Sequence, residues 1–282
     1  MPSPALSWVI LTLGDRPAAL ERAIASIRGT DVEIVVVFNG VPGRPIDGVT
    51  VIETEQNVGV PGGREIGLRR SQASVIGFLD DDAALVDPTT TRRIVERFAT
   101  DPRLGAVSMR IVDETNATNR RHVPRLGSGS SDDSGFVATF LGGASAVRRS
   151  AYDAAGGYWP ELFYAHEELD LSWRLHESGF RVFYDADLTV EHPATEISRH
   201  TEGWYRTGRN RVLIARRNLP LALMIVHPVV WLLIGAVRTP DRATRRSYVA
   251  GWRAGWRAGV HRSPVSWSTV WRLTRAGRPP IL

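Results

Sequence analysis

The sequence predicts an α/β fold, in which a mostly parallel sheet carries helices on both faces, followed by a helical C-terminal tail. Short apolar runs alternate with amphipathic segments along residues 1–218, as expected for strands connected by helices. Three consecutive aspartates follow one such run, and ligands bind such sheets at the carboxyl ends of the strands. Residues 219–282 combine an uncharged apolar run with many arginines and tryptophans, so we expect a separate, membrane-associated tail.

The first predicted strand is the apolar, β-branched run at residues 7–13, which ends in a turn at Gly14. Residues 18–27 then place apolar side chains on one face of a helix. The other predicted strands cover residues 33–38, 50–53, 75–79, 106–112, 181–184 and 188–191, with a strand pair within 136–147. The other predicted helices cover residues 64–71, 88–99 and 164–178. A glycine-rich turn lies at 57–63, and the length of the polar stretch 113–135 favours a mobile functional loop such as a lid.

The composition excludes several kinds of chemistry. The 282 residues contain no cysteine and no lysine, so all 35 basic side chains are arginine. Disulfides, thiolate zinc sites and cysteine nucleophiles are therefore excluded, and so are P-loop and Schiff-base lysines.

The charge is unevenly distributed along the chain. Residues 238–282 contain ten arginines and one acid, a net charge of +9, which leaves −4 for residues 1–237 within the overall +5. A basic segment of this kind favours anionic partners, either acidic lipid or nucleic acid. The N-terminus has no basic region followed by a long apolar run, so we expect no signal peptide and a cytoplasmic location, on the inner face of the plasma membrane.

Asp80, Asp81 and Asp82 directly follow the predicted strand 75–79. Three adjacent carboxylates repel one another, so we expect a compensating cation, and oxygen ligands favour Mg²⁺ or Mn²⁺. The structural alternative is a solvated acidic turn. A magnesium-dependent phosphatase or polymerase could use the same carboxylates, so the triplet alone does not define the reaction.

A second acidic group, Glu167, Glu168 and Asp170, lies at the start of the predicted helix 164–178. The helix dipole favours negative charge at this end, which is a sufficient structural explanation. The functional alternative is a general base that removes the proton from an acceptor hydroxyl. His192 follows the last predicted strand and is a candidate third metal ligand, although a histidine at a strand end is also often structural.

Six segments, in this order, resemble family 2 glycosyltransferases with the GT-A fold over roughly residues 6–218. They are VILTLGDRPAALERAIASI, VVVFNG, NVGVPGGREIGL, IGFLDDDA, FLGGASAVRRSAYDAAGGYWPELFYAHEELDLSWRL, and His192 followed by YRTGRNRVLIARRNLP. Their combination is far more specific than any one motif. Within the family, the chain is similar to rhamnosyltransferases and galactofuranosyltransferases.

The resemblance implies roles for individual positions. The nucleotide diphosphate is expected to contact Thr12, Leu13, Gly14, Arg16, Asn39, Asn57, Gly59, Gly62, Gly63, Arg64, Asp80, Asp81 and Arg209. The implied metal ligands are Asp82, Asp80 and His192, and the implied acceptor pocket contains Gly142, Gly143 and Trp159. Asn39 stands where the family often has an aspartate. Glu168 takes the position of the catalytic base, usually an aspartate, with Glu167 and Asp170 as fallback candidates.

The function implied by the resemblance is an inverting transfer of a sugar from a nucleotide-diphosphate donor to an acceptor hydroxyl, with Mn²⁺ or Mg²⁺. Glu168 deprotonates the acceptor, and the metal and arginines neutralise the departing diphosphate. A sugar nucleotidyltransferase is the alternative enzyme, but such enzymes usually begin with a glycine-rich loop containing arginine and lysine. A nucleic-acid binder is the non-enzymatic alternative, and it leaves the acidic groups unexplained because carboxylates repel phosphate. We therefore expect no nucleic-acid partner.

The tail begins with residues 219–237, which carry no charged side chain and are long enough to consider a membrane span. Two prolines and a histidine within this run weaken that prediction. Beyond it, aromatic residues recur at four-residue spacing beside arginines: Tyr248, Trp252 and Trp256, then Trp267 and Trp271. This pattern favours helices that lie in the lipid headgroup layer, and the alternative is that the tryptophans pack on the catalytic domain. We expect a lipid-linked or cell-envelope glycan as the acceptor.

Overall fold

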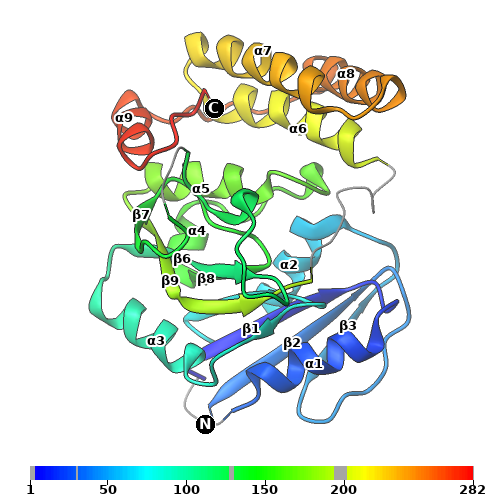
Figure 1. Ribbon diagram of the computed structural model, residues 1–282, viewed down its shortest axis with the longest axis vertical. Coiled ribbons are helices and arrows are strands. Elements are labelled where there is room, and N and C mark those ends of the chain that lie inside the picture. Colours follow the sequence, from blue (N-terminus) through cyan, green and yellow to red (C-terminus); the bar gives the residue numbers. More distant parts are fainter. Residues whose placement is uncertain (1–3, 30, 127–129, 194–201, 282) are drawn as a thin grey trace.

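The computed structural model describes residues 4–29, 31–126, 130–193 and 202–281. A central sheet is covered by helices on both faces, and the C-terminal part of the chain forms a helical layer at one end (Figure 1). The predicted α/β architecture is confirmed. Residues 127–129 of the predicted 113–135 loop lie outside the described residues.

The first four strands form the parallel half of the sheet, in spatial order β3-β2-β1-β4. They are β1 (Leu6–Thr12), β2 (Val32–Asn39), β3 (Thr50–Thr54) and β4 (Val75–Asp80). Successive side chains of a strand point to opposite faces, so Trp8 packs in one core and Val9 in the other. Helices α1 (Pro17–Ile27) and α2 (Gly59–Arg70) cover these two faces. Burial of both faces explains why β1 is an unbroken apolar run.

The second half of the sheet is mixed. Its strands are β8 (Ala144–Arg148), β6 (Leu104–Val112), β9 (Arg181–Glu191), β5 (Ala84–Leu85) and β7 (Gly135–Val137). β8 runs antiparallel to both β4 and β6, whereas β6 and β9 are parallel. β5 and β7 each pair antiparallel with β9. The predicted parallel pairing thus holds among the first four strands and between β6 and β9, whereas the pairs that involve β8, β5 and β7 are antiparallel.

Two strand predictions in this half are wrong. Residues 181–184 and 188–191 belong to one strand, whose register against β6 shifts between Met109 and Arg110. The predicted strand pair within 136–147 does not exist, because β7 pairs with β9 while β8 pairs with β4 and β6.

Further helices cover the sheet and lead to the tail. They are α3 (Thr90–Thr100), α4 (Arg149–Ala154) and α5 (Glu167–Glu177), with single turns η1 (Arg120–His122) and η2 (Pro160–Leu162). α5 begins later than predicted, because Phe163, Ala165 and His166 have positive φ angles of 61°, 69° and 71°. α2 begins earlier than predicted, since Pro61 fits the first turn of a helix.

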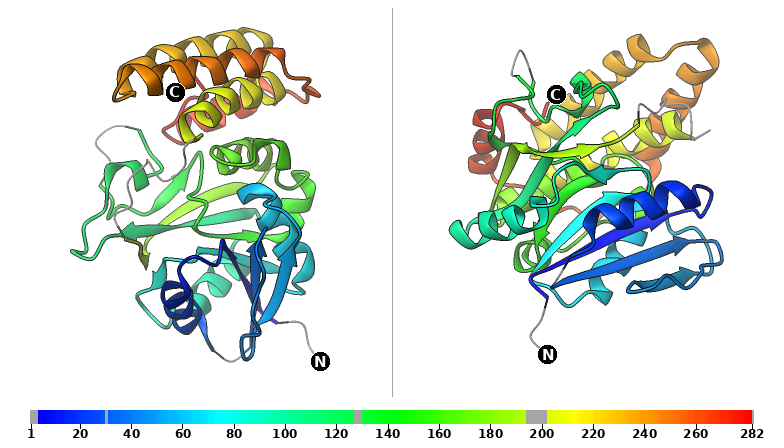
Figure 2. Two further views of the ribbon diagram at one scale, coloured as in Figure 1. Left: turned by 90° about the vertical axis from the view of Figure 1, so that its right-hand side faces the viewer. Right: turned by 60° about the horizontal axis from the view of Figure 1, so that its bottom comes forward.

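The C-terminal layer is built on close contacts between helices. It contains α6 (Gly203–Asn218), α7 (Leu221–Arg238), α8 (Arg242–Arg257) and α9 (Trp267–Arg275). α6 and α8 approach closely because Gly251 has no side chain. A Cβ there would lie only 1.9 Å from the Tyr205 carbonyl oxygen. α7 packs beside both of these helices, and α9 lies against α5 (Figures 1 and 2).

The aromatic side chains of α8 pack against the protein and are not free to lie in a headgroup layer, whereas Trp267 and Trp271 of α9 are exposed, so for these two residues the headgroup layer stays a prediction. Tyr248 is buried and its hydroxyl donates to the Trp231 carbonyl oxygen at 2.6 Å. The Trp252 indole donates to the Pro228 carbonyl oxygen at 2.9 Å. These residues attach α8 to α7.

Candidate active site

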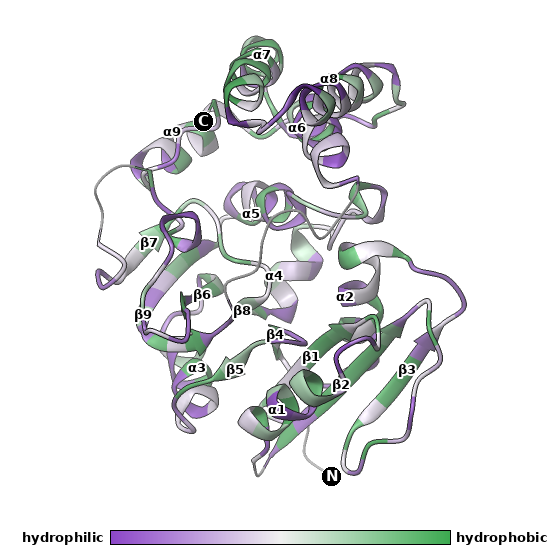
Figure 3. Cartoon of the chain, turned by 45° about the vertical axis from the view of Figure 1, so that its right-hand side comes forward, coloured by the Kyte–Doolittle hydropathy of each residue, from purple (hydrophilic) through white to green (hydrophobic). Residues whose placement is uncertain are grey.

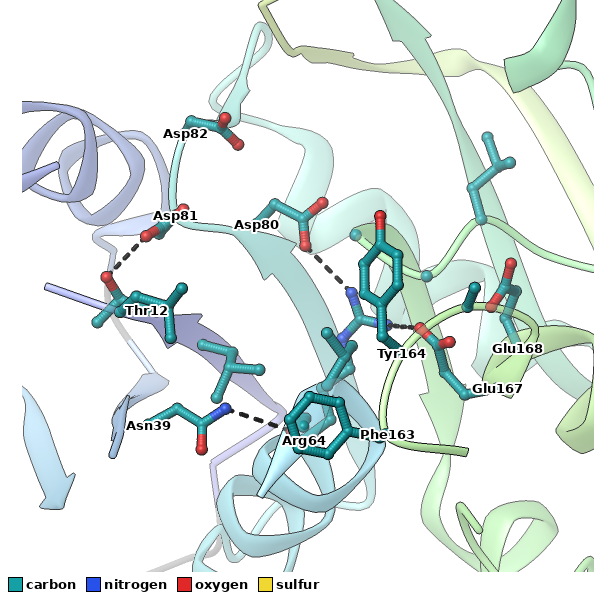
Figure 4. A pocket seen from close by; sticks show the side chains of 18 of the residues that line it. Thr12, Asn39, Arg64, Asp80, Asp81, Asp82, Phe163, Tyr164, Glu167 and Glu168 are labelled. Carbon is teal, nitrogen blue, oxygen red and sulfur yellow. Dashed lines mark hydrogen bonds and ion pairs between the residues drawn. The ribbon is translucent and has the colours of Figure 1, made fainter. Parts of the chain in front are cut away.

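A cleft of about 700 Å³ opens at the carboxyl ends of β1, β2 and β4, beside the start of α5 (Figure 4). Its walls come from both halves of the sheet and from the N-terminal part of α6. The lining residues are Leu11, Thr12, Leu13, Arg16, Asn39, Asn57, Gly59, Val60, Arg64, Asp80, Asp81, Asp82, Ile111, His122, Leu141, Gly142, Gly143, Phe163, Tyr164, Ala165, His166, Glu167, Glu168, His192, Glu202 and Arg206. Most positions singled out in the sequence therefore share one cleft.

The turn after β1 contacts the second and third aspartates. Thr12 Oγ1 donates to Asp81 Oδ2 at 2.6 Å and accepts from the Gly14 amide at 3.0 Å. Arg16 Nη2 lies 2.9 Å from Asp81 Oδ1, and Arg16 Nη1 pairs with Asp82. Burial raises the pKa of Asp81 to about 6, against the opposing effects of the Thr12 hydrogen bond and the Arg16 charge. One arginine thus bridges two neighbouring carboxylates.

Asn39, at the end of β2, orders the glycine-rich turn before α2. Its Nδ2 donates to Asn57 Oδ1 at 2.9 Å, and its Oδ1 accepts from the Val58 amide at 2.9 Å. The same Asn57 oxygen accepts from the Gly59 amide at 2.8 Å. An ionised aspartate has only acceptors, so it could not make both contacts. The departure from the family pattern at Asn39 therefore has a local structural reason.

Arg64, on α2, joins the two acidic groups of the cleft. Its Nη2 donates to Asp80 Oδ1 and its Nη1 to Glu167 Oε1, each at 3.1 Å (Figure 4). Burial alone would lower the pKa of this guanidinium, but the surrounding acidic side chains raise it above its ordinary value. Gly142 makes room for it, since a Cβ there would lie 2.5 Å from Arg64 Nη1.

His192 lies between the first and third aspartates. Its Nε2 is 3.6 Å from Asp80 Oδ2 and 3.2 Å from Asp82 Oδ1. Burial alone would lower the pKa of His192, but Asp80 and Asp82 raise it to about 9. Burial would also raise the pKa of Asp80, but His192 and Arg64 outweigh this and lower it to about 2. The two carboxylates therefore favour the protonated form of the imidazole.

Asp80, Asp82 and His192 have the donor atoms of metal ligands, and the imidazole lies near both carboxylates. Ligand atoms at 2.1 Å from an octahedral ion lie about 3.0 Å apart, close to the 3.2 and 3.6 Å measured here. Carboxylate oxygens with one imidazole suit Mn²⁺. No group of three such side chains among the described residues is already arranged around a metal position. Ion binding requires that Arg16 leave Asp82 and that His192 lose its proton.

Glu167 and Glu168 occupy different environments at the start of α5. Glu167 is buried, with Oε1 bonded to Arg64 and Oε2 without a partner among the residues that the structure describes. Burial and the adjacent Glu168 raise the pKa of Glu167, and Arg64 offsets this only in part. Glu168 is half-buried and lines the cleft. It is the carboxylate better placed to exchange a proton with a bound molecule.

The turn that leads into α5 is held from two sides. Asn210 Nδ2, on α6, donates to three carbonyl oxygens of residues 162–165 at 2.8–2.9 Å. On the other side, the Val60 amide donates to the Phe163 carbonyl oxygen at 2.7 Å. Gly59 permits this contact, because its φ is 76° and an added Cβ would lie 2.3 Å from the same oxygen. These contacts fix the direction in which α5 presents its first residues.

The sequence matches a known family over its N-terminal part. The family model for "Glycosyl transferase family 2" matches residues 7–156, more than half of the chain. The chain belongs to glycosyl transferase family 2. It is 26% identical over 210 residues to "Pre-mycofactocin glycosyltransferase" of two Mycobacterium tuberculosis strains, CDC 1551 / Oshkosh and ATCC 25618 / H37Rv. The match covers 65% of this chain and 42% of those proteins, so the chain spans less than half of their length.

Solved structures of glycosyltransferases have the same fold as this family 2 chain, which confirms the predicted GT-A fold. S. aureus TarS 1-349 has a TM-score of 0.61 at 12% identity, covering 87% of this chain and 78% of that one. Mannosyltransferase PcManGT from Pyrobaculum calidifontis, in complex with GDP-Man and Mn2+, has a TM-score of 0.56 at 18% identity, covering 97% and 79%. GalNAc-T7 with UDP, GalNAc and Mn2+ has a TM-score of 0.62 at 14% identity, covering 92% and 55%.

Six residues that the family 2 resemblance assigned to the site do not line the cleft. Three are the glycines Gly14, Gly62 and Gly63, and the other three have larger side chains. Asp170 is fully buried and pairs with Arg174 and Arg217, so it is not a candidate base. Trp159 lies under the Arg217 guanidinium, 4.5 Å from its Cζ, and packs against the core formed with the tail. Arg209 donates to a backbone carbonyl of η2 at 2.9 Å. Each of these three larger residues belongs to the contact between the sheet and the C-terminal helices.

The glycines assigned to the family 2 site make room for neighbouring protein atoms. Gly62 and Gly63 do not line the cleft, and a Cβ on Gly63 would lie 2.2 Å from Leu11 Cδ1. Gly63 lets α2 pack closely on β1, whereas a Cβ on Gly62 would lie 3.1 Å from the Val58 side chain just before α2. Gly143 does line the cleft, and a Cβ there would lie 1.9 Å from Asp80 Oδ2. The contact of Gly142 and Gly143 with an acceptor remains a prediction.

Several cleft residues were not predicted from the sequence, among them His122, Tyr164 and Arg206. His122 lies in the predicted 113–135 loop, and its ring centroid is 6.5 Å from that of His192. Burial lowers the pKa of His122 to about 4, so it is a neutral group in the cleft. Arg206 lies one helical turn before Arg209, and its guanidinium covers the Phe163 ring at 4.0 Å. Helical spacing was the signal that could have selected it, because both arginines lie on one face of α6.

Proposed function

We propose that the protein is an inverting, metal-dependent glycosyltransferase that moves a sugar from a nucleotide-diphosphate donor to an acceptor hydroxyl. One observation carries the proposal: Arg64 holds Asp80 on one side and Glu167 on the other. The carboxylates suited to a metal and diphosphate therefore face the same cleft as the half-buried Glu168. A donor and an acceptor can meet between these two groups.

The donor half of the cleft lies at the ends of β1, β2 and β4. Thr12, Asn39 and Asn57 line the wall proposed for the nucleoside. Asp80, Asp82 and His192 would hold Mn²⁺ or Mg²⁺, which supplies positive charge to the two phosphates when bound. Arg16 lines the cleft and, once released from Asp82, is the proposed partner of a phosphate oxygen.

Glu168 is the proposed base. Its carboxylate takes the proton of the acceptor hydroxyl while the acceptor oxygen forms a bond to the anomeric carbon. The bond between that carbon and the diphosphate oxygen breaks, and the diphosphate leaves with the electron pair. Attack opposite the leaving group inverts the anomeric centre. Glu167 stays paired with Arg64 and positions the first turn of α5.

The comparisons support the donor class. The PcManGT structure contains GDP-Man and Mn2+, and the GalNAc-T7 structure contains UDP, GalNAc and Mn2+. Rhamnose and galactofuranose are the first sugars to test, because the sequence resembles transferases of these sugars. For the acceptor we propose a lipid-linked or cell-envelope glycan, since the tail has an exposed apolar helix beside many arginines.

A thermal-shift panel tests the proposal. UDP-, GDP- and dTDP-sugars are added with and without Mn²⁺, and a bound donor stabilises the fold by about 2.7 kcal/mol at a hundredfold excess over Kd. We expect one nucleotide class to raise Tm only when Mn²⁺ is present. A parallel assay supplies a nucleoside triphosphate with a sugar phosphate. Release of diphosphate there, without any shift by nucleotide sugars, would show a nucleotidyltransferase and contradict the proposal.

A further inference from the structure

α7 is a largely apolar helix at the edge of the molecule (Figure 3), and several of its apolar side chains are exposed. Five of its large apolar side chains recur at four-residue spacing and are 44–85% exposed: Leu221, Ile225, Val229, Leu233 and Val237. By length and composition this helix could cross a membrane. A core helix of a soluble protein can have the same composition, but it would be mostly buried, and α7 is only 17% buried. The exposed face therefore lacks a partner within the described part of the chain.

The other side of α7 is fixed to the protein. Arg211 of α6 stacks on the Trp231 ring, with Cζ 3.5 Å from the ring centroid. His227 Nδ1 lies 2.6 Å from the Pro280 carbonyl oxygen, near the C-terminus. A Cβ on Gly235 would lie 2.2 Å from the Tyr248 ring. These contacts follow the helix along its length, so α7 lies flat on the molecule (Figures 1 and 2) and would have to break them to cross a bilayer.

α8, which packs on α7, carries a positive surface. Four exposed arginines line a depression on α8: Arg242, Arg245, Arg246 and Arg253. Gly251 faces α6, and Arg253 is two residues further on, about 200° around the helix. Arg253 therefore leaves α8 on the side turned away from α6. Asp241 is the only acid in the sequence from 238 to 282, so the charge of these arginines is not balanced locally.

We propose that the outer surface of α7 and α8 binds the surface of a membrane that contains anionic lipids. We call this surface the docking face, and we define it by the five apolar residues of α7 and the four arginines of α8 named above. The apolar side chains enter the acyl region, as expected for a helix lying in the interface. The guanidinium groups contact lipid phosphates, whose oxygens match their planar donors. The inference uses no cleft residue and is independent of the proposed chemistry.

Other occupants fit the docking face less well. A second copy placed by two-fold symmetry would bring the arginine depression of one chain close to that of the other, and like charges repel. A nucleic acid would meet the arginines but would leave the apolar stripe of α7 in water. An anionic membrane satisfies the charged and the apolar parts together.

The docking face lies one helix away from the cleft. Arg206, near the start of α6, lines the cleft, and Gly208, two residues further on, packs against the Tyr248 carbonyl oxygen of α8. If the proposed function is also correct, a chain bound through this face holds its cleft near the lipid surface. Location on the inner face of the plasma membrane is part of this proposal.

Co-sedimentation with vesicles tests the docking face. The full chain is mixed with phosphatidylcholine vesicles that contain or lack phosphatidylglycerol. Each arginine near an anionic surface contributes about a fivefold factor in binding, equivalent to ~1 kcal/mol. We expect R242Q/R246Q/R253Q to bind phosphatidylglycerol vesicles roughly 100-fold more weakly. The matched control R44Q/R92Q/R103Q removes the same charge from the sheet domain and should bind almost as the unaltered chain does. Equal losses in the two variants would overturn the proposal.

A second variant, L221Q/L233Q, tests the apolar stripe. Both side chains are more than 60% exposed, so the helix should keep its fold. We expect weaker binding to phosphatidylglycerol vesicles that high salt does not restore. The proposal fails if the unaltered chain forms a dimer whose amount rises with protein concentration, and L221Q/L233Q loses this dimer while its vesicle binding is unchanged. It also fails if a carbonate wash cannot release the full chain from membranes, because that outcome indicates a spanning helix. The donor thermal shift should be the same in every variant, so failure of the docking face and failure of the proposed function can be told apart.

Discussion

Replacement of Arg64 by methionine tests the link between the two acidic groups of the cleft. Arg64 is 6% exposed and donates to Asp80 and Glu167, each at 3.1 Å. Removing one partner of a buried ion pair costs about 3–5 kcal/mol, because the other charge stays buried. The Asp80 side chain is 41% exposed and is screened by solvent, whereas the Glu167 side chain is 7% exposed. We therefore expect Arg64→Met to lose ~3 kcal/mol of unfolding free energy, mostly through Glu167.

The size of this loss should depend on pH. Burial and Glu168 raise the pKa of Glu167 in the native protein, and loss of the Arg64 charge raises it further. Below the unfolded pKa, Glu167 is protonated in both states, so no charge is buried. As pH rises through the folded pKa, the protonated native form is lost and stability falls. The variant should therefore be destabilised more at about pH 9 than at about pH 5.

Urea unfolding measures the effect, and Arg69→Met is the matched control. Arg69 lies on the same helix, but its side chain is 52% exposed, where it pairs with Glu65 and Asp153. Surface pairs of this kind contribute about 0–1 kcal/mol. Sugar transfer by Arg64→Met should also fall, because the start of α5 loses its anchor. If both variants unfolded at the same urea concentration and Arg64→Met kept full transfer activity, the link between the acidic groups would be unimportant.

Three further predictions concern the metal, the turn before α5 and the glycine beside Asp80. Asp82→Asn, or EDTA added to the unaltered protein, should remove transfer and the Mn²⁺-dependent donor shift; full activity in excess EDTA would contradict the metal role. Asn210→Ala removes the donor to three carbonyl oxygens at a cost of about 1–3 kcal/mol, and it should lower kcat while donor Kd stays unchanged. A large rise in donor Kd would instead place Asn210 among the donor contacts. Gly143→Ala puts a Cβ 1.9 Å from Asp80 Oδ2 and should weaken donor binding measured by calorimetry. Gly259→Ala is the control, because its Cβ would have no heavy atom within 4 Å. Equal donor affinities of the two variants would contradict a role of Gly143 in placing Asp80.

The parallel half of the sheet and the donor side of the cleft could be predicted from sequence because their signals are local. A strand buried on both faces is a continuous apolar run, as in β1 and β4. The residue that follows such a strand lies at the ligand-binding edge, whatever the remaining topology. Thr12, Asn39 and the three aspartates therefore fall in one cleft as expected.

The acceptor side was harder to predict because its residues are placed by distant segments. Asp170 and Glu168 are two residues apart on α5, yet Asp170 faces Arg217 of α6 while Glu168 faces the cleft. No local pattern shows where α6 will pack. For the same reason Trp159 and Arg209 were assigned to the site, although they belong to the contact with the tail.

The tail shows a limit of amphipathic patterns. The four-residue spacing of the aromatic residues identifies the face of α8 that is shielded from water. It does not show whether lipid or protein covers that face. The Trp252 indole donates to a backbone carbonyl of α7. The exposed apolar side chains lie on α7 instead. The deciding signal was the pair of glycines in GWRAGWRAG, since Gly251 and Gly255 remove the side chains that would keep α6 away.

The central claim is that Glu168 removes the acceptor proton in a cleft that binds the donor independently. The decisive measurement compares Glu168→Gln with the unaltered protein, at saturating donor and Mn²⁺, for both sugar transfer and donor affinity. Loss of a general base lowers the rate by about 10²–10⁴-fold, and we predict a fall of that size with an almost unchanged donor Kd. Unaltered turnover in Glu168→Gln would contradict the claim.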